Sequence, residues 1–199
     1  MMKRTIGLVA GVVASIAVTP FAMAQQTTSP AALLAETTAT ALNEAPVVRS
    51  SKPNIILIFA DDMGYGDLSC YGQEKYKTPY LDKMAEEGTR FTDFYVASPA
   101  CSPSRASLLT GQYPMRTGVP NVLNPKSMTG IHPSAPLLPE LLKDKGYATA
   151  IVGKWHLGHL PEFMPLQNGF DQFFGLPYSN DMEPAPLFRD NTIIEAEAN

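Results

Sequence analysis

The sequence predicts an α/β fold in which helices cover both faces of a parallel sheet. Two features carry this prediction. The run Ile55–Ala60 is apolar at every position and has the length of a strand, which is typical of a strand buried on both faces of such a sheet. After it, helix-like and strand-like segments alternate up to about residue 158. The 199 residues, 45% hydrophobic and 17% charged, suffice for one globular domain.

The first helix is expected over residues 78–88. Thr78 is a candidate N-cap, Pro79 suits the first helical position, and Gly88 ends the pattern. The inward stripe of this helix would consist of Leu81, Met84 and Ala85. Residues 89–97 then alternate aromatic and polar side chains, as a strand does.

Another helix is expected over residues 134–146, ended by Gly146, with an inward face of Leu138, Leu141 and Leu142. Residues 147–155 follow it as a strand. Beyond Gly158 proline and aromatic residues are frequent, and no clear period predicts further elements.

The N-terminal residues resemble an export signal. Lys3 and Arg4 precede an apolar run, Ile6–Val18, and small residues at 22–24 would suit a cleavage site. A membrane anchor is the alternative, but glycine and polar residues interrupt the run and leave it short for a bilayer. We expect a leader over 1–24, a low-complexity tether over 25–52, and export to a bacterial periplasm or beyond. No stable membrane span is expected.

The charge pattern argues against one class of partner. The chain carries 15 basic and 19 acidic residues, a net charge of −4, and it has no Lys/Arg cluster in its expected mature part. Nucleic acid is therefore not an expected partner.

The segment CSPSRASLLTG, Cys101–Gly111, places a cysteine at the start of a predicted helix. Pro103 favours a first turn, Leu108 and Leu109 would form the buried face, and Gly111 would end the helix. A helix start favours an anion, and Arg105, one turn on, has a planar fork suited to an oxyanion. The predicted site is a seat for sulfate or phosphate next to residue 101. A disulfide with Cys70 is the simpler alternative in an exported chain.

This segment resembles the signature of the type I sulfatases, C-x-P-S-R-A-x-x-L-T-G, at every fixed position. The resemblance implies an alkaline-phosphatase-like fold with a mostly parallel central sheet, here truncated. It also implies that a maturation enzyme reading Pro103 and Arg105 converts Cys101 to formylglycine. The hydrated aldehyde would present two hydroxyls, one to attack sulfur and a second whose deprotonation later expels sulfate.

Two adjacent carboxylates, Asp61 and Asp62, follow the apolar run at the end where α/β proteins bind ligands. Gly64 and Gly66 would allow the turn that both need to reach one ion. Hard oxygen ligands suit Ca²⁺ or Mg²⁺, although such aspartates also commonly cap turns. The segment resembles the sulfatase metal loop, which implies Ca²⁺, with Mg²⁺ as an alternative, held by Asp61, Asp62 and the modified Cys101.

Two later segments also resemble sulfatase motifs. In GKWHLG, residues 153–158, the resemblance implies that Lys154 binds a sulfate oxygen and the hydrate, and that His156 takes the second proton of the hydrate. In PYSND, residues 177–181, it implies a substrate-binding role for Ser179. From the residues alone, each could equally be structural or part of a turn.

The expected function is therefore hydrolysis of a small-molecule or carbohydrate sulfate ester. The remaining sulfatase parts, a second metal pair, another histidine and a lysine, cannot be placed in this sequence. Residues 53–199 are thus expected to be the N-terminal portion of a catalytic domain, inactive by itself. The alternatives are a phosphonate or phosphodiester hydrolase of the same superfamily, and a non-catalytic exported binding protein with a Cys70–Cys101 disulfide.

Overall fold

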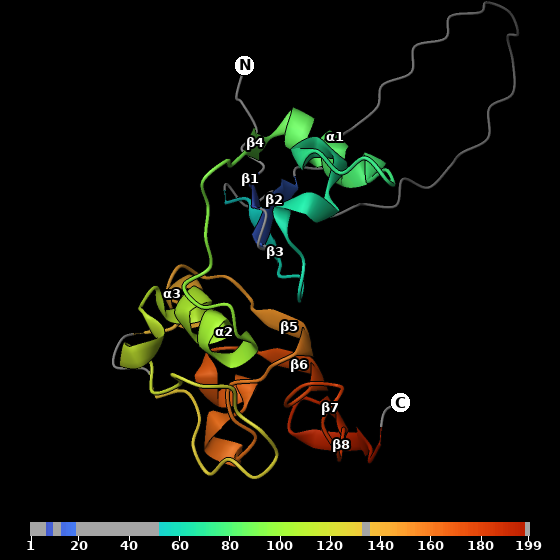
Figure 1. The fold of residues 1–199 in the computed structure, drawn as a ribbon. Helices are drawn as coiled ribbons and strands as arrows, with labels where there is room; N and C mark the ends of the chain where they lie inside the picture. Colours follow the sequence, from blue (N-terminus) through green and yellow to red (C-terminus); the bar gives the residue numbers. More distant parts are fainter. Residues whose placement is uncertain (1–6, 10–12, 19–51, 133–135, 198–199) are drawn as a thin grey trace, which may run out of the picture. The chain divides into compact units, whose positions relative to one another are not determined.

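The structure, a computed structural model, describes residues 7–9, 13–18, 52–132 and 136–197. The chain divides into two compact units, Met1–Phe94 and Tyr95–Asn199 (Figure 1). The α/β class predicted from the sequence is confirmed, with strand pairs of both directions in each sheet. Among the described residues, no helix is both long enough and apolar enough to cross a membrane. The expected tether lies almost wholly outside the described residues.

The N-terminal unit contains a four-stranded sheet in the order β3-β2-β1-β4. Its strands are β1 (Gly7–Val9), β2 (Val13–Val18), β3 (Asn54–Ile58) and β4 (Thr89–Arg90). The predicted strand at 55–60 is present as β3, but its predicted environment is wrong. It pairs antiparallel with β2, and Ile55, Ile56 and Ile58 remain 45–48% exposed. Within residues 52–94, only Leu68 has a fully buried apolar side chain.

Helix α1 (Pro79–Glu87) has the predicted bounds, with Thr78 as N-cap and Gly88 as C-cap. Its predicted stripe is confirmed, because Leu81, Met84 and Ala85 pack around Leu68. The Thr78 hydroxyl does not cap the helix; it donates to Asp82 at 2.9 Å. The Asp82 carboxylate also accepts the Ser69 hydroxyl at 2.7 Å and the Cys70 N–H at 2.8 Å, and these bonds lower its pKa. The strand predicted over 89–97 shrinks to β4.

The C-terminal unit packs helices α2 (Cys101–Thr110) and α3 (Leu138–Lys143) with a sheet of order β5-β6-β7-β8. The strands are β5 (Ala150–Lys154), β6 (Gln172–Leu176), β7 (Leu187–Arg189) and β8 (Thr192–Glu195). Strands β5 and β6 are parallel, with Ile151 opposite Phe173 and Lys154 opposite Leu176, and the other pairs are antiparallel. Strand β5 confirms the predicted strand, whereas β6, β7 and β8 were not predicted because their sequence shows no period.

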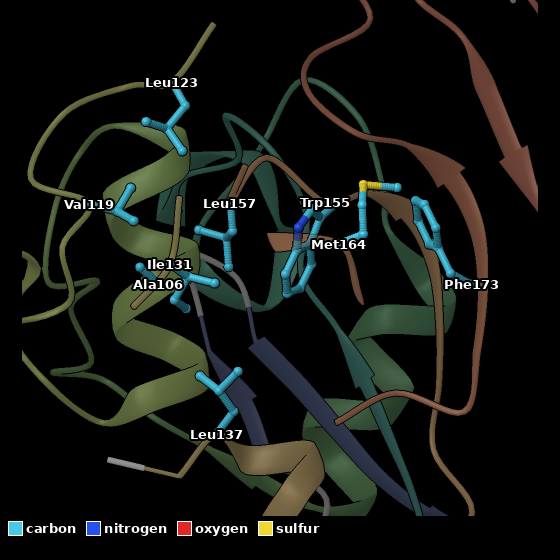
Figure 2. Close-up of a cluster of buried hydrophobic side chains, with 9 residues drawn as sticks. All are labelled: Ala106, Val119, Leu123, Ile131, Leu137, Trp155, Leu157, Met164 and Phe173. Atoms are coloured by element: carbon cyan, nitrogen blue, oxygen red, sulfur yellow. The ribbon is translucent and has the colours of Figure 1, made fainter. Parts of the chain in front are cut away.

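The core of this unit joins α2, the loop after it and β5–β6 (Figure 2). Side chains from these segments point into one cluster, made by Ala106, Val119, Leu123, Ile131, Leu137, Trp155, Leu157, Met164 and Phe173. On α2 the fully buried positions are the small residues Ser102, Pro103, Ala106 and Ser107. The prediction that Leu108 and Leu109 form the buried face is therefore wrong. Both side chains are only partly buried, and Leu109 packs against the outside of the cluster. Small side chains let α2 approach the core closely.

Helix α3 is shorter than predicted and is turned differently. It ends at Lys143, and Gly146 accommodates the following turn with φ +79°. Leu141, predicted to face inward, is 47% exposed, while Leu137 before the helix is fully buried. The sequence Leu137-Leu138-Pro139 sets where the helix begins, because Pro139 occupies the first turn and Leu137 becomes the N-cap.

Asp171 connects three elements of this unit. Its carboxylate pairs with Lys143 at 2.7 Å and accepts the Thr149 N–H at 2.9 Å, and both contacts lower its pKa. This joins the end of α3 to the starts of β5 and β6. A group whose pKa is lowered by folding stabilises the fold above its unfolded pKa and loses that contribution as pH falls through the folded value.

We expect Asp171→Asn to lower the urea midpoint of unfolding at pH 7, and to lower it less at an acidic pH below the lowered pKa of Asp171, where the carboxyl is neutral like the amide. Circular dichroism across a pH series measures this. Asp144→Asn, which removes an exposed carboxylate just after α3, is the control and should not destabilise. An equal loss for Asp171→Asn at both pH values would show that the charge of Asp171 is irrelevant.

Gly175 permits the close approach of β5 and β6. A Cβ there would lie 1.9 Å from the main-chain oxygen of Gly153, and its φ of +157° is one that other residues rarely adopt. Gly175→Ala should therefore cost roughly 3 kcal/mol or more in unfolding free energy. Gly111→Ala, at φ +66° with open space, should cost only about 1–2 kcal/mol. Equal costs by denaturant titration would refute the backbone clash.

Candidate active site

Helix α2 begins at Cys101, so the predicted cysteine occupies its first position. Ala100 is the N-cap in extended conformation, and the Ser104 N–H donates to its carbonyl at 3.1 Å. Pro103 has no N–H, so the N–H groups that the first turn leaves without an intrahelical acceptor belong to Cys101 and Ser102. These groups and the helix dipole favour an anion next to residue 101. Gly111 ends the helix, as predicted. It adopts a left-handed conformation.

Arg105 extends from α2 to the end of β5. One turn after Cys101, it shares a face of the helix with it, and its Nη1 donates to the main-chain oxygen of Lys154 at 2.6 Å. The guanidinium thus joins two sequence motifs that are 49 residues apart. Its planar fork carries further donors beyond the one that this bond uses.

The motif GKWHLG, residues 153–158, begins in β5 and is held beyond it mainly by backbone hydrogen bonds. The Trp155 N–H donates to Leu176 O at 2.9 Å and the His156 N–H donates to Pro177 O at 3.1 Å, which extends the β5–β6 pairing past both strands. Trp155 also donates from its indole to Phe163 O at 2.8 Å. His156 adopts a left-handed φ of +60° and is 1% exposed. Its ring is therefore fixed within the protein interior.

Leu123 orients the ring of His156. Its carbonyl oxygen lies 2.7 Å from His156 Nε2, and because a carbonyl only accepts, Nε2 must carry the proton. The neutral ring then has its basic lone pair on Nδ1. The N–H of the same Leu123 donates to Ser102 Oγ at 3.1 Å, and Ser102 is fully buried in the first turn of α2. Leu123 therefore connects the first turn of α2 to the ring of His156.

Lys154 and Ser179 form the third part of the site. The ammonium of Lys154 donates to Ser179 Oγ at 3.0 Å. Ser179 is buried, and its hydroxyl lowers the pKa of the nearby Asp181 carboxyl, as do the Asp181 backbone N–H and the charges of Lys154 and His156. The structure thus brings Lys154, His156 and Ser179 together with Asp181.

The carboxylate pair belongs to the N-terminal unit. Strand β3 ends at Ile58, three residues before Asp61, and both Asp61 and Asp62 are exposed. The predicted role of the glycines is wrong: Asp62 itself takes the left-handed φ of +56°, while Gly64 is extended. The two carboxylates offer the hard oxygens that Ca²⁺ or Mg²⁺ takes. Among the described residues, no cluster of three or more His, Cys, Asp or Glu side chains could hold a metal.

Both cysteines are free thiols, so the predicted alternative of a Cys70–Cys101 disulfide is wrong for this structure. Burial and the nearby Asp82 raise the pKa of the Cys70 thiol. His132 and His159, to which the sequence gives no role, make edge contacts with Phe163 and Tyr178.

Three contributors were missed from the sequence. Asp181 stands two residues after Ser179 in PYSND, where an acidic neighbour of a candidate polar residue could have been noticed. Ser102 lies inside the cysteine motif, but only its burial marks it. The carbonyl of Leu123 carries no sequence signal, because every residue has one.

Proteins of known family match most of this chain. The sulfatase family model matches residues 53–194. N-acetylgalactosamine-6-sulfatase of Sus scrofa is 52% identical over 153 residues, covering 69% of this chain and 29% of that protein. Arylsulfatase A of Homo sapiens is 53% identical over 135 residues, covering 66% and 27%. The crystal structure of Ps i-CgsB matches with a TM-score of 0.62 and 32% identity, covering 68% of this chain and 35% of that one.

The chain belongs to the sulfatase family. It spans less than a third of the length of these two curated relatives.

The hydrogen bond to Leu123 O predicts the tautomer of His156. In the neutral ring the proton should reside on Nε2, which ¹⁵N-edited NMR of the labelled protein detects directly. His132, whose side chain is exposed, is the internal comparison and should populate both tautomers. Detection of the proton on Nδ1 of His156 would contradict the orientation described here.

Proposed function

We propose that this chain provides the nucleophile part of an enzyme that hydrolyses organic sulfate esters. The single observation that carries the proposal is the set of hydrogen bonds at the start of α2, the helix that Cys101 begins: Arg105 donates to the Lys154 carbonyl, and Leu123 connects Ser102 to His156. Members of the sulfatase family generally use formylglycine and a divalent cation. The proposed substrate class is a carbohydrate or aryl sulfate, supported by the names of the relatives and by a neighbour described in complex with k-i-k-neocarrahexaose.

Formylglycine at position 101 would supply a hydrated aldehyde, with one hydroxyl as nucleophile and one for later proton loss. The chain's own groups would do the rest. The first-turn N–H groups of α2 and the guanidinium of Arg105 bind sulfuryl oxygens and hold the ester in line with residue 101. Lys154 places its ammonium against charge that grows on those oxygens.

His156 is the proposed proton acceptor. Its Nε2–H is used by Leu123 O, so the ring accepts a proton only at Nδ1. Burial of the ring and the fixed backbone at 155–157 hold that atom in one orientation. The hydrogen bond from Nε2 also stabilises the imidazolium that forms when Nδ1 is protonated.

Asp61 and Asp62 fit a hard divalent cation in kind but not in number. A Ca²⁺ takes six to eight oxygens, and Mg²⁺ takes six, so the two carboxylates would hold only part of the coordination shell of either cation. The cation would neutralise charge at the reacting oxygens. We propose Ca²⁺ because Asp61 and Asp62 offer hard oxygen donors and because their segment resembles the sulfatase metal loop.

A maturation enzyme that converts Cys101 is a proposed partner, supported by the match to the sulfatase signature. Export is proposed from the leader-like pattern at residues 1–24. The curated relatives reported above are mammalian, so they lend no support to a bacterial periplasm.

The protein, expressed from its native gene with a formylglycine-generating enzyme, should lose about 18 Da at the Cys101 peptide and hydrolyse a chromogenic aryl sulfate. Cys101→Ala should abolish turnover, and Cys101→Ser should retain sulfate covalently because it lacks a second hydroxyl. Intact-mass measurement and a turnover assay read both. A Cys101 that stays a thiol, with full activity, would refute the proposal; preference for phosphonate or phosphodiester substrates would favour the related hydrolase.

A further inference from the structure

Leu123 orients the His156 ring from a segment without helix or strand. Residues 117–132 form neither kind of element, and both chain neighbours of Leu123 are exposed. The Leu123 side chain lies in the core cluster, and two hydrogen bonds to side chains hold its backbone. Its N–H donates to Ser102 Oγ at 3.1 Å, and its carbonyl accepts from His156 Nε2 at 2.7 Å. The carbonyl that sets the tautomer of His156 is therefore held in part by the Ser102 hydroxyl.

We infer that Ser102 is a positioning residue: its hydroxyl holds Leu123 where the Leu123 carbonyl keeps the ring proton of His156 on Nε2 and the basic lone pair on Nδ1. The inference rests on the proposed function, in which Nδ1 accepts the proton, and extends it to a residue that acts through a main-chain carbonyl. Ser102 follows Cys101 directly in the first turn of α2. The turn that begins with the proposed nucleophile thus also orients the proposed proton acceptor.

Burial makes the Ser102–Leu123 hydrogen bond hard to replace. Ser102, Leu123 and His156 are all buried, so water is poorly placed to substitute for a lost partner. Without Ser102 Oγ the Leu123 N–H would lie in the interior without its acceptor, and an unsatisfied buried donor is costly. A small shift of Leu123 toward solvent would relieve that cost, because the residues on either side are already exposed. The same shift would draw the carbonyl away from Nε2, and the ring would lose the contact that selects its tautomer.

Ser107 separates this role from a packing role. It lies on the same helix, is also buried, and has the same small side chain. Among the described residues, however, its Oγ has no hydrogen-bond partner. If α2 needs small side chains only for close approach to the core, replacing either serine by alanine should have the same effect. If the hydroxyl of Ser102 positions Leu123, only Ser102→Ala should disturb His156.

The test uses the protein expressed from its native gene with a formylglycine-generating enzyme and labelled with ¹⁵N-histidine. Ser102→Ala removes the acceptor oxygen but keeps the main-chain N–H at the proposed sulfate seat. It should move the neutral ring of His156 from the Nε2–H tautomer toward the mixture expected for exposed His132. Ser107→Ala, the matched control, should leave the tautomer of His156 unchanged. A His156 ring that keeps its proton on Nε2 in Ser102→Ala would overturn the inference.

Turnover gives a second readout. Rates are expressed per formylglycine, counted from the mass loss of about 18 Da. Ser102→Ala should then lower kcat for an aryl sulfate roughly 10-fold and change KM little, because the proton acceptor is disturbed and the sulfate contacts are kept. Ser107→Ala should retain both constants. An equal fall in kcat for both variants would assign Ser102 to packing alone, against the inference.

A third readout needs no variant. In the unsubstituted protein the Leu123 amide should be protected from deuterium exchange about 100-fold more than the amide of exposed Val122, because its acceptor is buried. Equal protection of the two amides would contradict the inference. The expected protection and tautomer shift in a protein that hydrolyses no sulfate ester would instead refute the proposed function and leave the link from Ser102 to His156 intact.

Discussion

The hydrogen bond from Arg105 to the main-chain oxygen of Lys154 is the contact on which the site depends. It fixes the first half of α2 against the end of β5, the strand that ends at Lys154 just before His156. A guanidinium that is partly buried must find acceptors, and the last carbonyl of β5 is a fixed one. The core behind it, in which Ala106 of α2 packs with Trp155 and Leu157, prevents the two elements from separating. The same core packing therefore also holds the candidate site residues of α2 and β5 in place.

A second constraint is the balance of charge. The proposed seat at residue 101 would combine two permanent cations, Arg105 and Lys154, with the positive end of a helix, which would suit a sulfate ester but would repel itself when empty. Asp181 compensates part of this charge, because its carboxylate interacts favourably with the charges of Lys154 and His156. Its exposure keeps the cost of ionisation small.

The sequence was most informative where local chemistry decides structure. The ends of α1 and α2 follow from Pro79, Gly88 and Gly111, and β5 follows from its apolar run. It was less informative where long-range contacts decide. The burial of Ser102 instead of Leu108, and the outward turn of Leu141, depend on what lies opposite each helix. Of the site, the motif residues could be named in advance. The carbonyl of Leu123 could not, because only the fold brings it to His156.

The two units differ in how firmly they hold the residues proposed for sulfate-ester hydrolysis. In residues 95–132 and 136–197, hydrogen bonds and core packing within the unit hold Arg105, Lys154 and His156, which are the residues proposed for catalysis. The acidic pair follows β3, whose isoleucines stay about half exposed. Full burial of an isoleucine contributes about 1.5–3 kcal/mol, so each of these leaves roughly 1 kcal/mol unrealised. Residues 55–60, which are apolar at every position, favour cover on both faces, and a hard cation needs more oxygens than Asp61 and Asp62 provide. In the described part of this unit, the burial of β3 and the proposed cation site are therefore both incomplete.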